Sequence, residues 1–123
     1  MNKRKLGEEK ERFVCEYLKT GGYRILEQNF RCRFGEVDIV ARHGKYLVFI
    51  EIKYRSGACS GMPEEAVDLR KQKTISRVAL FYLSRYGYGI DTPVRFDVAA
   101  VSEDASSPVV HVIQNAFEYI GKR

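Results

Sequence analysis

Four charged side chains stand inside strand-like apolar sequence, and their types and spacing are suited to metal chemistry. They are Glu36, Asp38, Glu51 and Lys53. Residues two apart on a strand share a face, so the first two point to one side together and the last two form a second pair. Three acids on a half-buried face repel one another, and Lys53 offsets only part of their charge. A hard divalent ion with oxygen ligands, Mg²⁺ or Mn²⁺, is therefore the expected partner of this cluster.

The two pairs meet only if the strands that carry them form a hairpin in a suitable register. The sequence on both sides of His43 and Gly44 has the alternation or the β-branched and aromatic content of strands, and these two residues are a turn signal. A symmetric reversal at this turn places Glu36 opposite Glu51. It also makes Asp38 and Glu51 diagonal neighbours roughly 7–8 Å apart at Cα, close enough for both to reach one ion.

The remaining predicted elements support this hairpin. Residues 7–20 and 63–86 have the periodicity of amphipathic helices, and residues 23–30, 94–101 and 109–113 are typical of strands. This order predicts an α/β or α+β fold with a mixed sheet and helices packed on it. The chain has 123 residues, of which 45% are hydrophobic, so we expect a single domain over residues 1–123.

Composition indicates the cellular compartment and the class of partner that we expect for this protein. The formal net charge of +5 favours a polyanionic partner. Three widely spaced cysteines without a C-x-x-C pair argue against a disulfide framework and a zinc knuckle, and fit a reducing cytoplasm. The sequence has no apolar run of spanning length and no signal-peptide pattern, so we expect a soluble cytoplasmic protein that does not contact a membrane.

Basic side chains gather at two places where a nucleic-acid backbone could bind. Arg31 and Arg33 precede the hairpin and either hold phosphates or belong to a solvated loop. Arg70, Lys73 and Arg77 recur at three and four residues on the predicted second helix. They form a basic stripe that either follows a nucleic-acid backbone or faces solvent.

Three further features border the candidate site. Lys71 and Gln72 could reach toward it from the start of the predicted second helix. Residues 56–62 are small, and they form either a substrate lid or an ordinary connection. Arg95 and Asp97 share a face of a predicted strand, and we expect them to pair with each other rather than to take part in catalysis.

Motifs spread along the chain resemble those of the bacterial YraN family, which is distantly similar to archaeal Holliday junction resolvases. These motifs are Glu11, residues 22–26, Asn29, Arg31, residues 35–38, residues 51–55, residues 66–67, residues 71–73, residues 82–83 and residues 95–98. The resemblance covers roughly residues 6–101, nearly the whole chain.

The resemblance implies a restriction-endonuclease-like fold of the PD-(D/E)xK type, with a central mixed sheet flanked by helices. A metal-dependent phosphodiesterase site would lie on the central hairpin. Asp38 and Glu51 match the metal-binding acids of that motif, and Lys53 matches its lysine. Glu11 matches the first-helix glutamate that completes the site in resolvase-like members, and Glu36 is a further candidate for an outer ligand.

Two functions of different classes follow from these observations. The first is a Mg²⁺- or Mn²⁺-dependent endonuclease that hydrolyses phosphodiester bonds in branched or repair-intermediate DNA, as a monomer or a homodimer. The second is a non-catalytic nucleic-acid-binding or repair-accessory module on the same fold. The predicted nucleic-acid contacts are Arg31, Arg33, Arg55, Arg70, Lys71, Gln72, Lys73 and Arg77.

Overall fold

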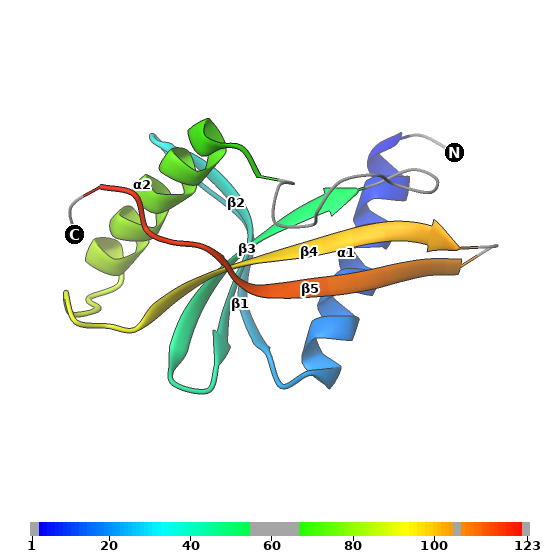
Figure 1. Cartoon of the computed structure of the whole chain (residues 1–123), viewed down its shortest axis with the longest axis horizontal. Helices are drawn as coiled ribbons and strands as arrows, with labels where there is room; N and C mark the ends of the chain where they lie inside the picture. Colours follow the sequence, from blue (N-terminus) through cyan, green and yellow to red (C-terminus); the bar gives the residue numbers. More distant parts are fainter. Residues whose placement is uncertain (1–2, 55–66, 105–106, 122–123) are drawn as a thin grey trace.

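The fold is built on a mixed five-stranded sheet in which the strands follow chain order. The computed structural model describes residues 3–54, 67–104 and 107–121. Its elements are α1 (Lys3–Thr20), β1 (Arg24–Cys32), β2 (Gly35–His43), β3 (Tyr46–Tyr54), α2 (Leu69–Arg85), β4 (Val94–Asp104) and β5 (Ser107–Phe117). Strands β3 and β4 are parallel, and every other neighbouring pair is antiparallel. The predicted central mixed sheet flanked by helices is confirmed (Figure 1), and it is consistent with a restriction-endonuclease-like architecture.

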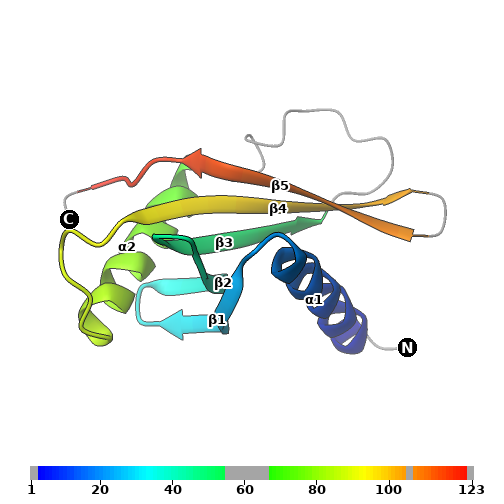
Figure 2. The same cartoon turned by 90° about the horizontal axis from the view of Figure 1, so that it is seen from below.

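The two helices cover opposite faces of the sheet and lie toward opposite ends of it (Figure 2). On the α2 face, Val40 and Phe49 belong to a core with the buried side chains of that helix. On the α1 face, Ile39 and Ile50 belong to a second core. Because successive strand residues point to opposite faces, the central strands supply both cores and must be apolar throughout. This explains the almost unbroken apolar run of β3.

The second helix begins later than the sequence pattern predicts. It starts at Leu69, and Asp68 caps it by accepting a 2.8 Å hydrogen bond from the backbone nitrogen of Lys71. The prediction that residues 67 and 68 belong to this helix is wrong, because Val67 and Asp68 are not helical. Residues 63–66, where the helix was predicted to start, lie outside the described residues. The predicted loop at 56–62 lies outside them as well. None of the described helices has the length and apolar content needed to cross a membrane.

The hairpin turn lies one position later than predicted. His43 pairs with Tyr46, so the two-residue loop consists of Gly44 and Lys45. Gly44 has φ 60, a conformation that glycine adopts without the strain that a side chain would introduce, and tight hairpin turns require such a residue. The turn is therefore set by the position of the glycine within the loop.

This turn shifts the pairing of the strands by two residues. The predicted pairing of Glu36 with Glu51 is wrong, because the pair Ile39–Ile50 puts Glu51 in register with Asp38. On its other side Glu36 pairs with Arg31 of β1. A shift by two residues preserves the face to which each side chain points. Asp38 consequently lies across from Glu51 rather than diagonal to it. These two acids are therefore closer in register than predicted, whereas Glu36 is not opposite Glu51.

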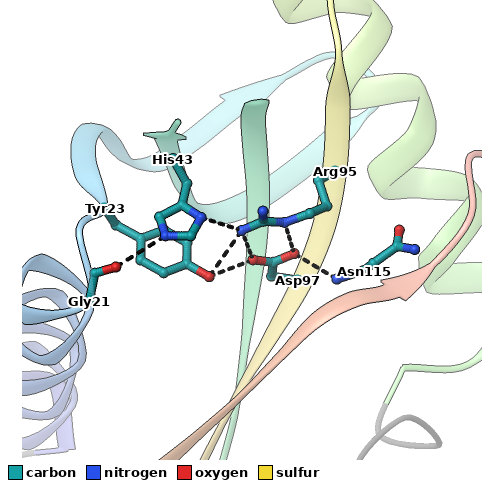
Figure 3. A network of polar contacts seen from close by, with 6 residues as sticks. All are labelled: Gly21, Tyr23, His43, Arg95, Asp97 and Asn115. Atoms are coloured by element: carbon teal, nitrogen blue, oxygen red, sulfur yellow. Dashed lines mark hydrogen bonds and ion pairs between the residues drawn. The ribbon is translucent and has the colours of Figure 1, made fainter. Parts of the chain in front are cut away.

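A buried polar network joins the start of β1 to β4 and β5 (Figure 3), and it confirms the predicted pairing of Arg95 with Asp97. Arg95 donates from Nε and Nη2 to the two carboxylate oxygens of Asp97, at 2.9 and 2.8 Å. Tyr23 donates to Asp97 at 2.7 Å, and the backbone nitrogen of Asn115 does so at 2.9 Å. Arg95 also donates to Nδ1 of His43 at 3.0 Å. These contacts tie together segments far apart in sequence, so the network has a structural role.

Candidate active site

Strands β2 and β3 separate at the two candidate metal-binding acids. The last residues that pair across this ladder are Ile39 and Ile50. The next residues, Asp38 and Glu51, face each other beyond the end of the ladder. From Glu51 onward β3 pairs in parallel with β4, where Glu51 lies beside Val98. The sheet thus opens between β2 and β3 where the two carboxylates meet.

The Asp38 side chain spans this opening. Its Oδ2 accepts a 2.7 Å hydrogen bond from the backbone nitrogen of Ile52 on β3. On the other side, β1 is interrupted at Asn29, which has φ 54 and stands across from Asp38 between two regular pairs. Asp38 therefore has no backbone ladder partner on either side. On the β3 side its carboxylate takes the place of a backbone acceptor for the Ile52 nitrogen.

Glu51 is a buried acid with an incomplete set of partners. It is 8% exposed, and its Oε2 lies 3.3 Å from Nζ of Lys71 but accepts no hydrogen bond from any described residue. Burial and, next, the adjacent Asp38 carboxylate together raise the pKa of Glu51 to about 8, against the opposing effect of Lys71. Two adjacent carboxylates, one with an unsatisfied buried oxygen, form a donor set that fits a hard divalent cation.

A cleft of about 310 Å³ leads to Glu51 from the α2 side of the sheet. It is lined by Glu51, Ile52, Lys53, Val67, Asp68 and Lys71. Lys53 is exposed at this cleft, whereas Lys71 makes the ion pair with Glu51. Asp68 was not among the predicted site residues, although an aspartate three residues before a helical lysine is a recognisable cap signal. The cleft brings Glu51 together with a cation from α2.

Glu11 approaches the site from α1 beside Asn29 and Tyr54, two motif residues that were not among the predicted site residues. Asn29 donates a 3.3 Å hydrogen bond to Oε2 of Glu11. Burial, together with the negative charges of Glu11 and Asp38, raises the pKa of Tyr54 to about 12. The phenol of Tyr54 therefore lies within electrostatic reach of both acids. A positive φ is tolerated by asparagine more than by most residues. Asn29 is one of the motif residues on which the family resemblance rests, but no role in the site was predicted for it.

Glu36 lies apart from the acidic pair. Its Oε2 accepts from Nε of Arg31 at 2.8 Å, and the two residues line a shallow depression separate from the cleft at Glu51. No group of three or more His, Cys, Asp or Glu side chains in the described ranges could hold one metal ion. Of the four predicted metal ligands, the structure brings Asp38 and Glu51 together directly, with Glu11 nearby.

The predicted nucleic-acid contacts occupy several environments. Gln72 donates from Nε2 to the backbone oxygen of Val67 at 3.0 Å, so it holds the entry to α2 in place. The Arg33 guanidinium lies 4.9 Å from the centre of the Phe34 ring, and Arg55 lies outside the described residues. Three of the predicted contacts, Arg70, Lys73 and Arg77, line a second cleft along α2.

The chain is similar to many bacterial proteins over almost its whole length. The model of the family described as "Uncharacterised protein family UPF0102" matches residues 10–101. A UPF0102 protein of Lachnoclostridium phytofermentans is 44% identical over 121 residues, which cover 98% of this chain and 99% of that protein. One of Geobacter sulfurreducens is 50% identical over 116 residues, covering 92% and 88%.

Among solved structures, SfsA of Pyrococcus furiosus in complex with Ca²⁺ has a TM-score of 0.38 and 14% identity, covering 92% of this chain and 62% of that one. This likeness is too weak to support an inference. The family match and the close relatives confirm the resemblance to the YraN family that the motifs indicated. The chain belongs to the UPF0102 (YraN) family.

Proposed function

We propose that this protein is a metal-dependent endonuclease that hydrolyses phosphodiester bonds in branched or repair-intermediate DNA in the cytoplasm. The observation that carries the proposal is the placement of Asp38 and Glu51 side by side where β2 leaves β3. Two adjacent carboxylates, of which Glu51 is buried and Asp38 half-buried, are unfavourable unless a cation balances them. A protein that only binds nucleic acid gains nothing from acids facing a phosphate backbone.

In this proposal Asp38 and Glu51 hold one Mg²⁺ or Mn²⁺, with Glu11 as an outer ligand near Tyr54. When bound, such an ion supplies a water of lowered pKa and offsets the charge that develops on the phosphate. The hydrogen bond from Ile52 keeps the Asp38 carboxylate directed into the opening. This rigid backbone contact would limit reorganisation of the site during the reaction.

Two lysines have separate tasks in the proposed site. Lys53, on the same strand as Glu51 and exposed to the cleft, would orient the attacking water or donate to the scissile phosphate. Lys71 would stay at Glu51 and neutralise part of the acidic charge as a phosphate approaches. Both side chains reach the cleft from rigid elements, β3 and α2, which suits a site that has to hold a precise geometry.

A second function is favoured by the basic side chains along α2. The cleft that contains Arg70, Lys73 and Arg77 has the charge of a nucleic-acid contact whether or not the acids catalyse a reaction. A binding or repair-accessory module would keep this cleft and would lose nothing when Asp38 is neutralised. The two functions therefore differ in their response to one substitution.

Cleavage of labelled junction, flap and linear DNAs in Mg²⁺ or Mn²⁺ tests the proposal. Asp38→Asn removes a ligand charge but retains an acceptor for the Ile52 nitrogen, and we expect it to lower the cleavage rate by at least about a thousandfold. Lys53→Ala should lower the rate by about a hundredfold. Lys45→Ala, a change in the exposed turn at the other end of β3, is the charge-matched control and should cleave like the wild type.

Cleavage that disappears in EDTA and in Asp38→Asn, but persists in Lys45→Ala, would support the endonuclease and exclude a contaminating nuclease. If no substrate is cut and all four proteins bind DNA equally well, the endonuclease proposal fails and the binding module takes its place.

A further inference from the structure

A basic cleft of about 400 Å³ lies between α2 and the turn that joins β1 to β2. The residues that line it are Phe34, Leu69, Arg70, Lys73, Thr74 and Arg77. We call this site the basic cleft. Three of these side chains carry a positive charge, and none carries a negative one. The cleft therefore combines a concentrated positive charge with an aromatic and an aliphatic side chain.

The positive charges of the basic cleft are not balanced within the described protein. No described residue forms an ion pair with Arg70, Lys73 or Arg77, whereas Arg31 pairs with Glu36 and Arg95 with Asp97. Cations on an ordinary solvated helix face are commonly interspersed with acids three or four residues away. The described residues leave these three charges uncompensated, and the phosphates of a nucleic-acid strand are a complementary partner for three cations along one helix.

The apolar members of the basic cleft distinguish it from a simple phosphate site. Phe34 is 40% exposed and Leu69 is 58% exposed, although both are large apolar side chains. The edge of the Phe34 ring meets Phe81, with ring centres 6.2 Å apart, and the Arg33 guanidinium lies 4.9 Å from its centre. The ring is thus held by neighbours while part of its surface stays open to a ligand.

The turn that carries Phe34 is pinned to α2. Gly35 has φ 144, and a Cβ atom at this position would lie 2.5 Å from Cγ2 of Thr74, so only glycine allows this close approach. The exposed ring is consequently fixed at one place above the helix. A fixed, open aromatic ring beside unpaired cations is the arrangement with which proteins stack the bases of single-stranded nucleic acid.

We propose that the basic cleft binds a single-stranded segment of nucleic acid, with phosphates on Arg70, Lys73 and Arg77 and an unpaired base stacked on Phe34. A duplex presents phosphates but keeps the faces of its bases within the stack. The first turn of α2 contributes to both the basic cleft and the cleft at Glu51, with Leu69 lining the former and Lys71 the latter. If the proposed endonuclease function holds, on which this last step rests, the preferred substrate carries a single strand beside the cleavage site.

Binding measured without divalent cations tests the proposal independently of cleavage. Fluorescence anisotropy with a labelled single strand and with a duplex of the same sequence would be compared for the wild type, Phe34→Ala, Phe34→Tyr and Lys45→Ala. Because Phe34→Ala removes the stacking of one base, it should weaken binding of the single strand roughly 5- to 100-fold relative to the wild type. Duplex binding should change less than about twofold, while Phe34→Tyr and Lys45→Ala should behave like the wild type.

A second variant tests the phosphate contacts. Lys73→Ala should weaken binding of both nucleic acids and reduce the slope of log K against log salt by about 0.7–0.9. Thermal unfolding of each variant confirms that it is folded. The proposal is overturned if folded Phe34→Ala binds the single strand like the wild type, or loses duplex binding equally. It is also overturned if polyglutamate of equal charge displaces the single strand as well as unlabelled DNA does. These binding measurements do not depend on cleavage, so they test the basic cleft even if the protein cuts no substrate.

Discussion

Nζ of Lys71 lies 3.3 Å from Oε2 of Glu51, so α2 supplies a cation to an acid that the strand buries. Lys53, two residues along the same strand, was predicted as the lysine of the site, and Lys71 was predicted to reach toward it from the second helix. In the structure the two lysines approach the cleft from different elements. They can therefore be separated by substitution.

Lys71→Ala should reduce metal-dependent cleavage by about ten- to a hundredfold, because it removes one charge that offsets the acids and the approaching phosphate. Lys71→Arg keeps the charge and should retain more activity than the alanine variant. Cleavage rates at saturating Mg²⁺ check this expectation, with Lys45→Ala as the matched control. Equal rates for Lys71→Ala and the wild type would show that the ion pair has only a structural role.

Glu51→Gln should stabilise the protein in EDTA by about 1 kcal/mol, since it removes a carboxyl group whose ionisation is opposed by burial and by Asp38. The same substitution should abolish stabilisation by Mn²⁺, which for the wild type should reach about 2.7 kcal/mol at a hundredfold excess over Kd. Urea unfolding with EDTA and with Mn²⁺ measures both effects. Glu36→Gln is the control, because Glu36 lies outside the cleft. A Mn²⁺ effect of equal size in Glu51→Gln would exclude Glu51 as a ligand.

Asp97→Ala should lower the free energy of unfolding by about 3–5 kcal/mol, because it leaves the buried Arg95 guanidinium without its carboxylate. The phenol of Tyr23 and the backbone nitrogen of Asn115 lose their acceptor as well. Urea unfolding gives the change in stability. DNA binding by the folded fraction should match that of the wild type, and a selective loss of binding would contradict the structural role of this network.

The stability of the protein should fall as the pH rises from 10 to 12. Burial and the bond to Asp97 raise the pKa of Tyr23 to about 12, whereas an unfolded tyrosine ionises near pH 10. The unfolded chain therefore binds fewer protons in this interval, so the stabilisation is complete below pH 10 and is lost toward pH 12. Tyr23→Phe should remove on the order of 2 kcal/mol of this pH-dependent loss.

Urea unfolding at pH 9, 10 and 11 measures this slope. The exposed Tyr17 provides the matched control, since Tyr17→Phe should leave the pH dependence unchanged. An identical slope in Tyr23→Phe and the wild type would contradict the contribution of Tyr23. Tyr54 and Tyr82, whose pKa values are also raised to about 12, account for the loss that remains.

Gly35→Ala should destabilise the protein by about 2–3 kcal/mol, through its positive φ and through contact with Thr74. Thr74→Ser removes the methyl group that a Cβ atom would meet. We therefore expect Gly35→Ala to be less harmful in a Thr74→Ser background than in the wild type. A double-mutant cycle measured by urea unfolding gives the coupling, and strictly additive effects would show that the two residues do not make contact.

Local patterns were sufficient for most of the fold. Alternation and β-branched content predicted the strands, and helical spacing predicted that the second helix is amphipathic. Ile75, Val78 and Tyr82 of α2 are buried, as expected of its apolar face. Two-residue periodicity also predicted that Arg95 and Asp97 share a face. The start of α2 was predicted too early because the acids and proline before it resemble a first turn, whereas the hydrogen bond from Lys71 to Asp68 makes Asp68 the cap.

The sequence by itself determined which face of a strand each acid occupies, because that depends only on a local period of two. The tertiary structure decided which residues meet. Gly44 sets the register, the separation of β2 from β3 creates the opening, and α2 brings Lys71 to Glu51. Arg31 binds Glu36 away from the cleft at Glu51. Such pairings depend on loop geometry and on the packing of distant elements, and no local period encodes them.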